Sequence, residues 1–472
     1  MRMYKTARRL LFAALGILVA CAPGPAQTLH LPPHEKIVLK NGLTVLLMEK
    51  HGVPIINIAA IVKTGAAADP AGQDGLASTT AALLRKGTKS RSAQQYAKDL
   101  DYIGASFDAE ASADFTQISA EFLTKDTAKG LELVADAILH PTFPQEETEK
   151  LLSQSLDGVR AAKDEAGNVL GIYYYGYLFG GHPYGRPSSG DEISLKRIHR
   201  SEVEKFYETY YAPGNTILAV AGEFKAAEMR KSLEDIFGAW PAKEVPKVNI
   251  PVAQAAKGKR LLLIDKPDST QTYFAIGNVG TAVGDPDRVT IRVVNTVFGG
   301  RFTSMLNEAL RVESGLTYGA ESFFDSRKTP GAFGMFSYTK NETTVQAIDL
   351  ALQTMAKLRK DGLTEEQLNS AKTFIKGQFP PSLETSGELV ERIASNEFYG
   401  LNDDEVNQLE ARLAAVTPEM ARQAIQKHFP ESQLVFVLIG KASEIGPAVQ
   451  KYAEKQDARA IKDAGFWPPP GK

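Results

Sequence analysis

Two stretches of this 472-residue chain repeat each other, and the distance between them constrains the fold more than any other feature. Residues 61–65 are followed by Asp69-Pro70 and a helical pattern. Residues 276–280 are likewise followed by Asp285-Pro286 and a helical pattern. The offset of about 218 residues far exceeds the roughly 20–50 residues of a solenoid repeat. We therefore expect a duplicated domain and not an array.

The ends of the two halves repeat as well. A helix from Pro418, the turn His428-Phe429-Pro430 and the strand 434–439 with Gly440 match the segment 210–222. Each half is thus expected to close on a helix, a turn and a buried strand that ends at glycine.

The opening of the first half has the pattern of an antiparallel sheet. Asn41-Gly42 is a hairpin signal, because both residues tolerate the positive φ of a tight turn. Strands are predicted over 37–39, 43–48, 55–62, 105–109 and 115–122, and helices over 127–138, 146–163 and 168–178. The last helix carries four tyrosines at positions 173, 174, 175 and 177, which favour packing against a neighbouring element over a binding face.

A segment rich in proline and lysine, residues 240–259, separates the two halves. We expect a first domain over 33–240, a linker over 241–258, a second domain over 259–450 and a tail over 451–472.

The N-terminus predicts export. Basic residues precede an apolar run over 10–19 and a small, turn-forming segment over 22–26, so residues 1–26 are read as an export segment. Cys21, the only cysteine, follows Leu18-Val19-Ala20, which resembles a bacterial lipoprotein box. The alternative is cleavage near Ala26 with Cys21 discarded. We expect a periplasmic protein, anchored to the membrane only if Cys21 is acylated.

Charge excludes some partners. The formal net charge of −2 provides no global field that would attract nucleic acid or acidic lipid. A single cysteine allows no internal disulfide and no thiolate metal site, so the core must supply the stability.

Several short segments, in their order and spacing, resemble the pitrilysin/insulinase family of zinc metallopeptidases, which includes proteins like the mitochondrial processing peptidase. They are Leu39-Lys40-Asn41-Gly42-Leu43, Gly75-Leu76-Ala77, Lys86-Gly87-Thr88, His182-Pro183-Tyr184-Gly185, residues 211–222, Gly299-Gly300 and Gly315-Leu316-Thr317-Tyr318-Gly319. The resemblance implies two homologous α+β domains, each a mostly antiparallel sheet of about six strands flanked by helices. Together they would form half of a clam-shell chamber.

The family's inverted zinc motif H-x-x-E-H falls between these flanks, but its positions are vacant here. Alignment places Ser78 and Ala82 at the two histidine ligands and Ala81 at the general-base glutamate. The third ligand falls on Gly158, and its neighbour Asp157 is better explained as a solvated helix residue. The seven histidines form no pair at ligand spacing, so no metal is expected in this chain.

A second family feature is retained. The resemblance assigns Arg311 and Tyr318 to a pair that reaches the substrate in active members. Tyrosine can hydrogen-bond a scissile carbonyl or its oxyanion, and arginine can fix peptide carbonyls. The structural alternative is an arginine at a helix end and a tyrosine at a strand edge. The sequence also departs from the family at Met305, where Ser-Arg-Leu is common.

Two functions follow from the resemblance. The first is a non-catalytic subunit of an exported heterodimeric zinc peptidase: a homologous partner would hold the zinc, and this chain would position unfolded peptide substrates with Arg311 and Tyr318. The second is a non-enzymatic scaffold or peptide-binding protein with the same shell. No phosphate loop, nucleophile elbow or telling carboxylate pair supports an unrelated enzyme.

Overall fold

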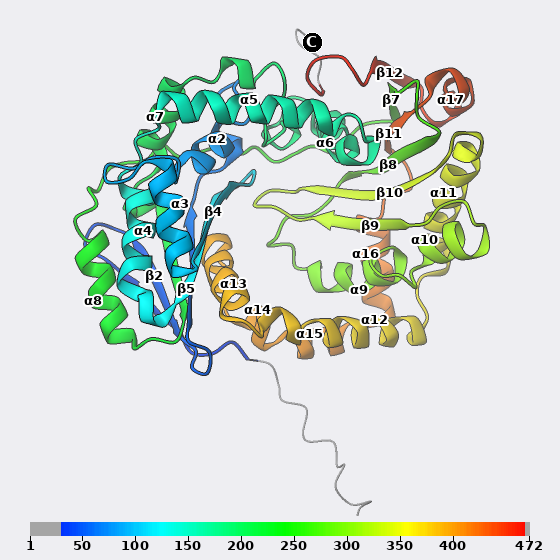
Figure 1. Ribbon diagram of the computed structural model, residues 1–472. Helices are drawn as coiled ribbons and strands as arrows, with labels where there is room; N and C mark the ends of the chain where they lie inside the picture. Colours follow the sequence, from blue (N-terminus) through cyan, green and yellow to red (C-terminus); the bar gives the residue numbers. More distant parts are fainter. Residues whose placement is uncertain (1–29, 468–472) are drawn as a thin grey trace, which may run out of the picture.

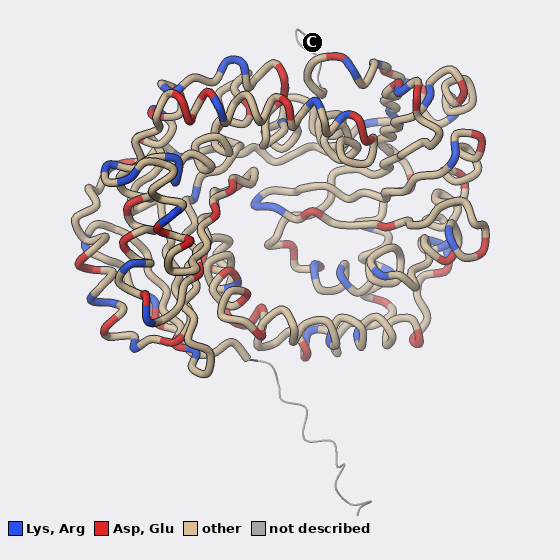
Figure 2. Tube along the Cα trace, viewed as in Figure 1, with Lys and Arg blue, Asp and Glu red and all other residues tan. Residues whose placement is uncertain are grey.

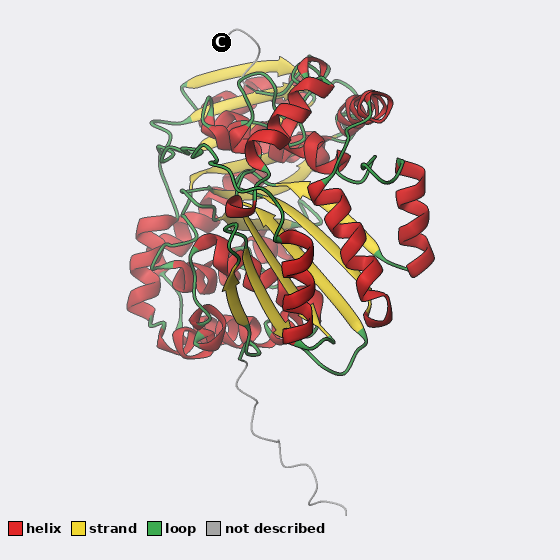
Figure 3. Ribbon diagram, turned by 90° about the vertical axis from the view of Figure 1, so that its left-hand side faces the viewer, coloured by secondary structure: helices red, strands yellow, loops and turns green. Residues whose placement is uncertain are grey.

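The computed structural model describes residues 30–467 and contains two six-stranded sheets that lie at opposite sides of the molecule (Figure 1). The predicted export segment and Cys21 lie outside the described residues. Figure 3 shows the strands of both sheets surrounded by helices. The predicted α+β class with two homologous sheets is confirmed.

The first sheet has the strand order β1-β2-β6-β3-β5-β4. Its strands are β1 (Glu35–Val38), β2 (Thr44–Glu49), β3 (Ile55–Val62), β4 (Ser106–Ala111), β5 (Thr116–Leu123) and β6 (Thr216–Gly222). Only β2 and β6 run parallel, and every other neighbouring pair is antiparallel.

The second sheet has the order β12-β7-β11-β8-β10-β9. Its strands are β7 (Arg260–Asp265), β8 (Gln271–Val279), β9 (Ala320–Asp325), β10 (Ala332–Lys340), β11 (Val435–Gly440) and β12 (Lys455–Ala460). Five of its strands take the places of β2, β3, β4, β5 and β6, with the same parallel central pair. The repeat seen in the sequence is therefore a repeat of topology.

The two sheets differ at their outer strand. In the first sheet β1 pairs antiparallel with β2, whereas in the second β12 pairs parallel with β7. Residues 455–460 thus belong to the second sheet, so the tail predicted from residue 451 is wrong at this point. The strand was missed because Lys-Gln-Asp-Ala-Arg-Ala has no apolar face and lies at an edge, where its residues stay largely exposed.

Helices pack against both sheets. In the first half they are α2 (Leu76–Leu83), α3 (Ala93–Ile103), α4 (Thr127–Leu139), α5 (Gln145–Ala162), α6 (Ala166–Phe179), α7 (Arg200–Tyr210) and α8 (Ala226–Phe237). In the second half they are α9 (Arg288–Phe298), α10 (Met305–Asn307), α11 (Thr344–Asp361), α12 (Glu365–Gln378), α13 (Ser386–Tyr399), α14 (Asp404–Asn407), α15 (Leu409–Ala415), α16 (Pro418–His428) and α17 (Ala442–Val449). Residues 241–259 form no helix or strand, although Ala253 and Ala256 within them are buried.

Each half packs one helix, α6 or α13, against the sheet of the other half. α13, from the second half, packs on β3 and β6 of the first sheet, as its position beside those strands in Figure 1 illustrates. Leu46, Met48 and Ile61 of the first sheet accordingly share a core with Leu389 and Ile393 of α13. Both faces of β2 are therefore buried, which explains its unbroken apolar run.

α6 makes the reciprocal contact, because it leaves the first half to pack on β8 and β11 of the second sheet. Its tyrosines confirm the predicted packing role. Tyr174 donates its phenol proton to the carbonyl of Phe333, and Tyr177 donates to the carbonyl of Leu261 at 3.1 Å. Burial and paired hydroxyls together fix α6 against the other half.

No helix within residues 30–467 is long and apolar enough to cross a membrane. Lysine and arginine are interspersed with aspartate and glutamate along the outer helices (Figure 2), consistent with a net charge close to zero.

Candidate functional site

Helix α2, which carries the altered zinc motif, begins at a buried carboxylate. Gly75, its N-cap, has φ of 96°, a conformation that favours glycine. One oxygen of Asp69 accepts from the Gly75 N–H at 2.8 Å, and the other accepts from the Ala77 N–H at 2.9 Å. These bonds satisfy two N–H groups that lack a partner inside the helix.

Asp69 is only 4% exposed. Burial raises the pKa of its carboxyl to about 7, although the two N–H donors and the nearby Arg186 act in the opposite direction. Desolvation therefore outweighs the capping bonds, and part of the population is protonated near neutral pH.

The vacant motif positions are filled by packing. Ser78 donates its hydroxyl proton to the carbonyl of Ser188 at 2.7 Å. Ala81 is fully buried, and Ala82 is half-buried. A zinc ion needs imidazole, thiolate or carboxylate ligands, and none of these three side chains offers one.

The third ligand position is equally unsuited to zinc. Gly158 lies on α5, and a Cβ added there would meet nothing within 4 Å. The adjacent Asp157 is 71% exposed and pairs with Arg160 at 3.2 Å, as expected of a solvated helix residue. The residues at the motif positions therefore do not fit a zinc ion.

Within residues 30–467, one group of side chains has metal-ligand geometry: Asp285, Asp287 and His428, in the second half. Lys427 places its ammonium 2.8 Å from the Asp287 carboxylate, and His428 approaches the same oxygen at 2.9 Å. Lys427 therefore already places a positive charge beside the carboxylate that a metal ion would need. This cluster is better explained as an ion pair that joins α16 to the start of α9.

Arg311 lies on a π-helical turn, Glu308–Glu313, that continues α10. Such turns are rare and occur often at functional sites. The guanidinium lies over the ring of Phe302, 4.3 Å from its centroid. In the described part of the chain no carboxylate forms an ion pair with Arg311, so its donors remain available to a ligand.

Tyr318 is 79% exposed, although it follows a fixed stretch of backbone. The N–H of Leu316 donates to the carbonyl of Leu310 at 2.9 Å, and the N–H of Gly319 donates to the Thr317 hydroxyl at 3.2 Å. The backbone before Tyr318 is therefore held against the turn that carries Arg311, and the backbone after it is held by Thr317, while the phenol projects outward.

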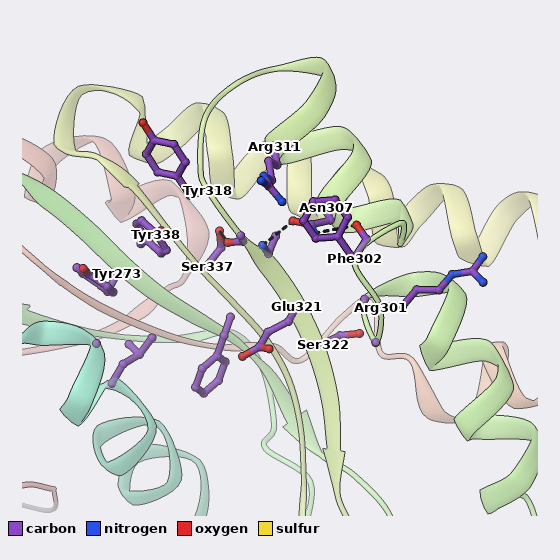
Figure 4. A pocket seen from close by; sticks show the side chains of 17 residues that line it. Tyr273, Arg301, Phe302, Asn307, Arg311, Tyr318, Glu321, Ser322, Ser337 and Tyr338 are labelled. Atoms are coloured by element: carbon purple, nitrogen blue, oxygen red, sulfur yellow. Dashed lines mark hydrogen bonds between the residues drawn. The ribbon is translucent and has the colours of Figure 1, made fainter. Parts of the chain in front are cut away.

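Arg311 and Tyr318 line one cavity of about 620 Å³. Figure 4 shows Tyr318, Tyr338 and Tyr273 along one side, with Arg311 and Phe302 opposite. The structure thus brings together the two residues that the sequence paired. Met305, which replaces a family arginine, does not line this cavity.

A second cavity of about 390 Å³ adjoins the first, because Gly167 and Phe336 line both. Ser188, which accepts the hydrogen bond from Ser78, lies in the wall of this second cavity. Neighbouring cavities therefore lie between the Arg311–Tyr318 pair and the helix of the altered motif.

The edge strand β9 beside this site has hydrogen-bond partners on its outer side. The Ala320 N–H donates to Asn307 Oδ1 at 3.1 Å, and the Ser322 N–H donates to the carbonyl of Gly299 at 3.1 Å. Asn295 donates its amide proton to the carbonyl of Ser322 at 2.9 Å. At the start of β9, the outward N–H of Ala320 and both outward backbone groups of Ser322 are thus already bonded.

The equivalent edge strand β4 is different. The Ser112 N–H donates to Phe115 O at 2.8 Å, and this fixes which groups face β5. The alternation of an antiparallel ladder turns the backbone of Phe107, Ala109 and Ala111 away from the sheet. Between residues 30 and 467 these outward groups have no hydrogen-bond partner.

The sequence did not identify Tyr273, Tyr338 or Asn307 as parts of the site. Tyr273 and Tyr338 pair across β8 and β10, but they stand 65 positions apart in the chain. The available signal was that both are aromatic residues on the partly exposed face of otherwise buried strands.

Two family models match the chain. The model of "Insulinase (Peptidase family M16)" matches residues 44–191, and that of "Peptidase M16 inactive domain" matches residues 197–374. Together they cover more than half of the chain. The chain belongs to peptidase family M16.

Related proteins align with this chain over most of its length. YmxG of Bacillus subtilis, described as an uncharacterized zinc protease, is 24% identical over 84% of this chain and 96% of its own. Rv2782c of Mycobacterium tuberculosis, described in the same way, is 24% identical over 90% and 96%.

Solved structures share the fold. A peptidase M16 inactive domain from Pseudomonas fluorescens aligns with a TM-score of 0.81 and 25% identity, over 86% of this chain and 98% of that one. A protease from Helicobacter pylori aligns with a TM-score of 0.81 and 20% identity, over 87% and 100%. With serine, alanine and glycine at the ligand positions, this chain is an inactive-type homologue within the family.

Proposed function

We propose that this chain is the non-catalytic subunit of an exported, heterodimeric M16 metallopeptidase that cleaves unfolded peptides. One observation carries the proposal: Arg311 and Tyr318 share a cavity and have free polar groups, in a chain whose motif helix has no ligand. A homologous partner would hold the zinc, and this chain would position the substrate.

The two residues have separate tasks in this proposal. The phenol of Tyr318 projects far enough from the chain to donate a hydrogen bond to a peptide carbonyl, or to the oxyanion that replaces it. The guanidinium of Arg311, stacked on Phe302, holds a second carbonyl in fixed geometry. Neither task requires a metal in this chain.

The substrate's main chain needs a partner for its own hydrogen bonds. Extended peptides bind by adding a strand to a free sheet edge. Because the outward groups at the start of β9 are already bonded and those of β4 are not, we place the added strand on β4. The exposed carboxylates of Asp108 and Glu110 line a cavity of about 250 Å³ beside that strand.

The experiment is a reconstitution. The purified chain should contain no stoichiometric zinc and cleave no peptide, whereas copurification with a zinc-bearing homologue should yield an active complex. Stoichiometric zinc in the chain alone, or cleavage by it, would contradict the proposal.

Tyr318→Phe tests the shared site directly. The variant should assemble normally but lower kcat of the complex about 10- to 1,000-fold, because one oxyanion donor is lost. Tyr102→Phe is a matched control, since Tyr102 is 90% exposed on α3. An unchanged kcat in Tyr318→Phe would remove the catalytic role.

The second candidate is a scaffold or peptide-binding protein that never meets a zinc-bearing subunit. The free polar groups of Arg311 and Tyr318 argue against it, because a scaffold gains nothing from them. An adjacent gene for an exported protein with H-x-x-E-H would favour the heterodimer. Mass spectrometry of the exported protein would decide whether Cys21 is acylated or removed.

A further inference from the structure

The cavity around Arg311 has an aromatic wall that the proposed catalytic pair does not use. Tyr273 and Tyr338 stack there, with ring centroids 5.2 Å apart and planes 19° apart. Phe336 lies two residues before Tyr338 and therefore on the same face of β10. All three rings are half-buried, so each keeps apolar surface toward the cavity.

α6 approaches this wall closely through two glycines. A Cβ added at Gly167 would lie 3.2 Å from Cε1 of Tyr273, and one added at Gly171 would lie 3.9 Å from the ring of Phe336. These glycines stand one turn apart on one side of the helix. Leu170 also lines the cavity from the same helix, so the wall and the helix together present apolar surface to it.

The polar residues of this cavity are mostly engaged within the protein. Asn307 bonds the backbone of Phe302 and Ala320, and the Ser337 hydroxyl donates to the carbonyl of Gly319 at 2.8 Å. The groups that remain for a ligand are the phenols, the Arg311 guanidinium and the exposed carboxylate of Glu321, which stands opposite Phe336 across β9 and β10. The inner part of the cavity therefore offers aromatic surface and few hydrogen bonds.

The size of the space agrees with a peptide segment. About 620 Å³ lies within the range of roughly 300–1,000 Å³ that ligand sites occupy. This is more than one side chain fills, and it leaves room for main chain beside Arg311 and Tyr318.

We infer that this cavity is a specificity subsite for a large apolar side chain, aromatic or long aliphatic, of the bound peptide. The inference rests on the proposed function and names the substrate feature that this chain selects. The rings of Tyr273, Phe336 and Tyr338 contact the side chain, while Arg311 and Tyr318 hold the adjacent main chain.

The test is direct binding to the isolated full chain, which requires no partner. The probes are blocked pentapeptides, acetyl-Ala-Ala-X-Ala-Ala-amide, with X as phenylalanine, alanine or lysine, measured by calorimetry. The phenylalanine peptide should bind about tenfold more tightly than the other two, since it buries an aromatic side chain.

Tyr338→Ala should abolish that preference, whereas Tyr338→Phe should retain it because the ring remains. Gly167→Ala adds a methyl group toward Tyr273 and should weaken the phenylalanine peptide selectively. Its melting temperature should stay close to that of the wild type, because the better helix propensity of alanine offsets the tight contact with the Tyr273 ring. Tyr102→Ala is the surface control.

Equal affinities for the three peptides, absence of binding, or an unchanged preference in both Tyr338→Ala and Gly167→Ala would each overturn the inference. Failure of the proposed function is a separate result, because it is read from zinc content and reconstituted cleavage. A chain that prefers the phenylalanine peptide but never supports cleavage would retain the subsite and lose the heterodimer.

Discussion

β4 and β9 occupy the same place in the two copies of the repeated domain, yet their outer edges differ. Asn295, Asn307 and the carbonyl of Gly299 bond the outward backbone of β9. On β4 the outward groups have no partner within residues 30–467, and Ser78 of the neighbouring motif helix bonds the carbonyl of Ser188.

The difference shows which parts of the repeat are free to change. The buried faces of both sheets are fixed by two shared cores, so their strand order is retained. Edges are held by only a few polar side chains, and a change of one or two of these opens or closes a strand to another chain. One half of the molecule is therefore suited to receive a strand and the other is not.

The largest expected difference is between Gly222 and Gly440, the glycines that end the equivalent strands β6 and β11. Gly222 has φ of 141°, and a Cβ there would lie 2.1 Å from the carbonyl oxygen of Ile55. At Gly440 the nearest atoms belong to side chains, namely the Thr272 hydroxyl at 2.8 Å and the Ile445 methyl at 3.0 Å. Gly222→Ala should cost about 4 kcal/mol and Gly440→Ala about 1 kcal/mol in urea unfolding. Equal costs would mean that the two strand ends are equivalent.

Hydrogen exchange tests the edges themselves. The amide proton of Ala109 on β4 has no partner in the described part of the chain, whereas that of Ser322 on β9 is bonded to Gly299. We expect exchange at Ala109 to be about 100-fold faster, since it needs no opening of a hydrogen bond. Added peptide should slow exchange at Ala109 and leave Ser322 unchanged. Equal protection in the free chain would remove the distinction between the edges.

Stability should depend on the ionisation of Asp69, which caps the motif helix. The folded carboxyl keeps its proton up to about pH 7, whereas its ordinary pKa is 3.8. Between these values the folded state binds more protons than the unfolded state, so its contribution to stability is present at low pH and lost as pH rises through 7. The difference in unfolding free energy between wild type and Asp69→Asn should fall by about 2 kcal/mol from about pH 5 to about pH 8. A constant or rising difference would contradict it.

The smallest effect is expected from the hydrogen bonds between Asn295 and Ser322 of β9. Asn295→Ala removes a donor to the Ser322 carbonyl and an acceptor for its hydroxyl, which lies at 2.7 Å. Unfolding free energy should drop by about 1–2 kcal/mol. Glu110→Ala on β4 should cost less than about 0.5 kcal/mol, because its side chain is exposed. An Asn295→Ala variant as stable as the wild type would indicate that β9 is held by its pairing with β10 alone.

Much of the fold could be predicted because the duplicated pattern fixed the number of domains and the order of their elements. The exchange of α6 and α13 could not. Periodicity shows that a helix has an apolar face, but it does not show which sheet covers that face. The bonds from Tyr174 and Tyr177 to the other half became apparent only once α6 was placed.

The candidate site was predicted in part. Arg311 and Tyr318 stand seven positions apart in a recognisable context, so the sequence could pair them. The aromatic wall requires strand register, which places Tyr338 opposite Tyr273 across β8 and β10. Local sequence carries no information on such a pairing between distant strands.

The exchange of helices also sets an order of events during biogenesis. One apolar face of the first sheet, including Leu46, Met48 and Ile61, is covered by α13, which ends at Tyr399. Until that part of the chain has been synthesised or translocated, the first domain cannot complete its core. A chain truncated after the linker would expose that face, so the two halves must mature as one cooperative unit.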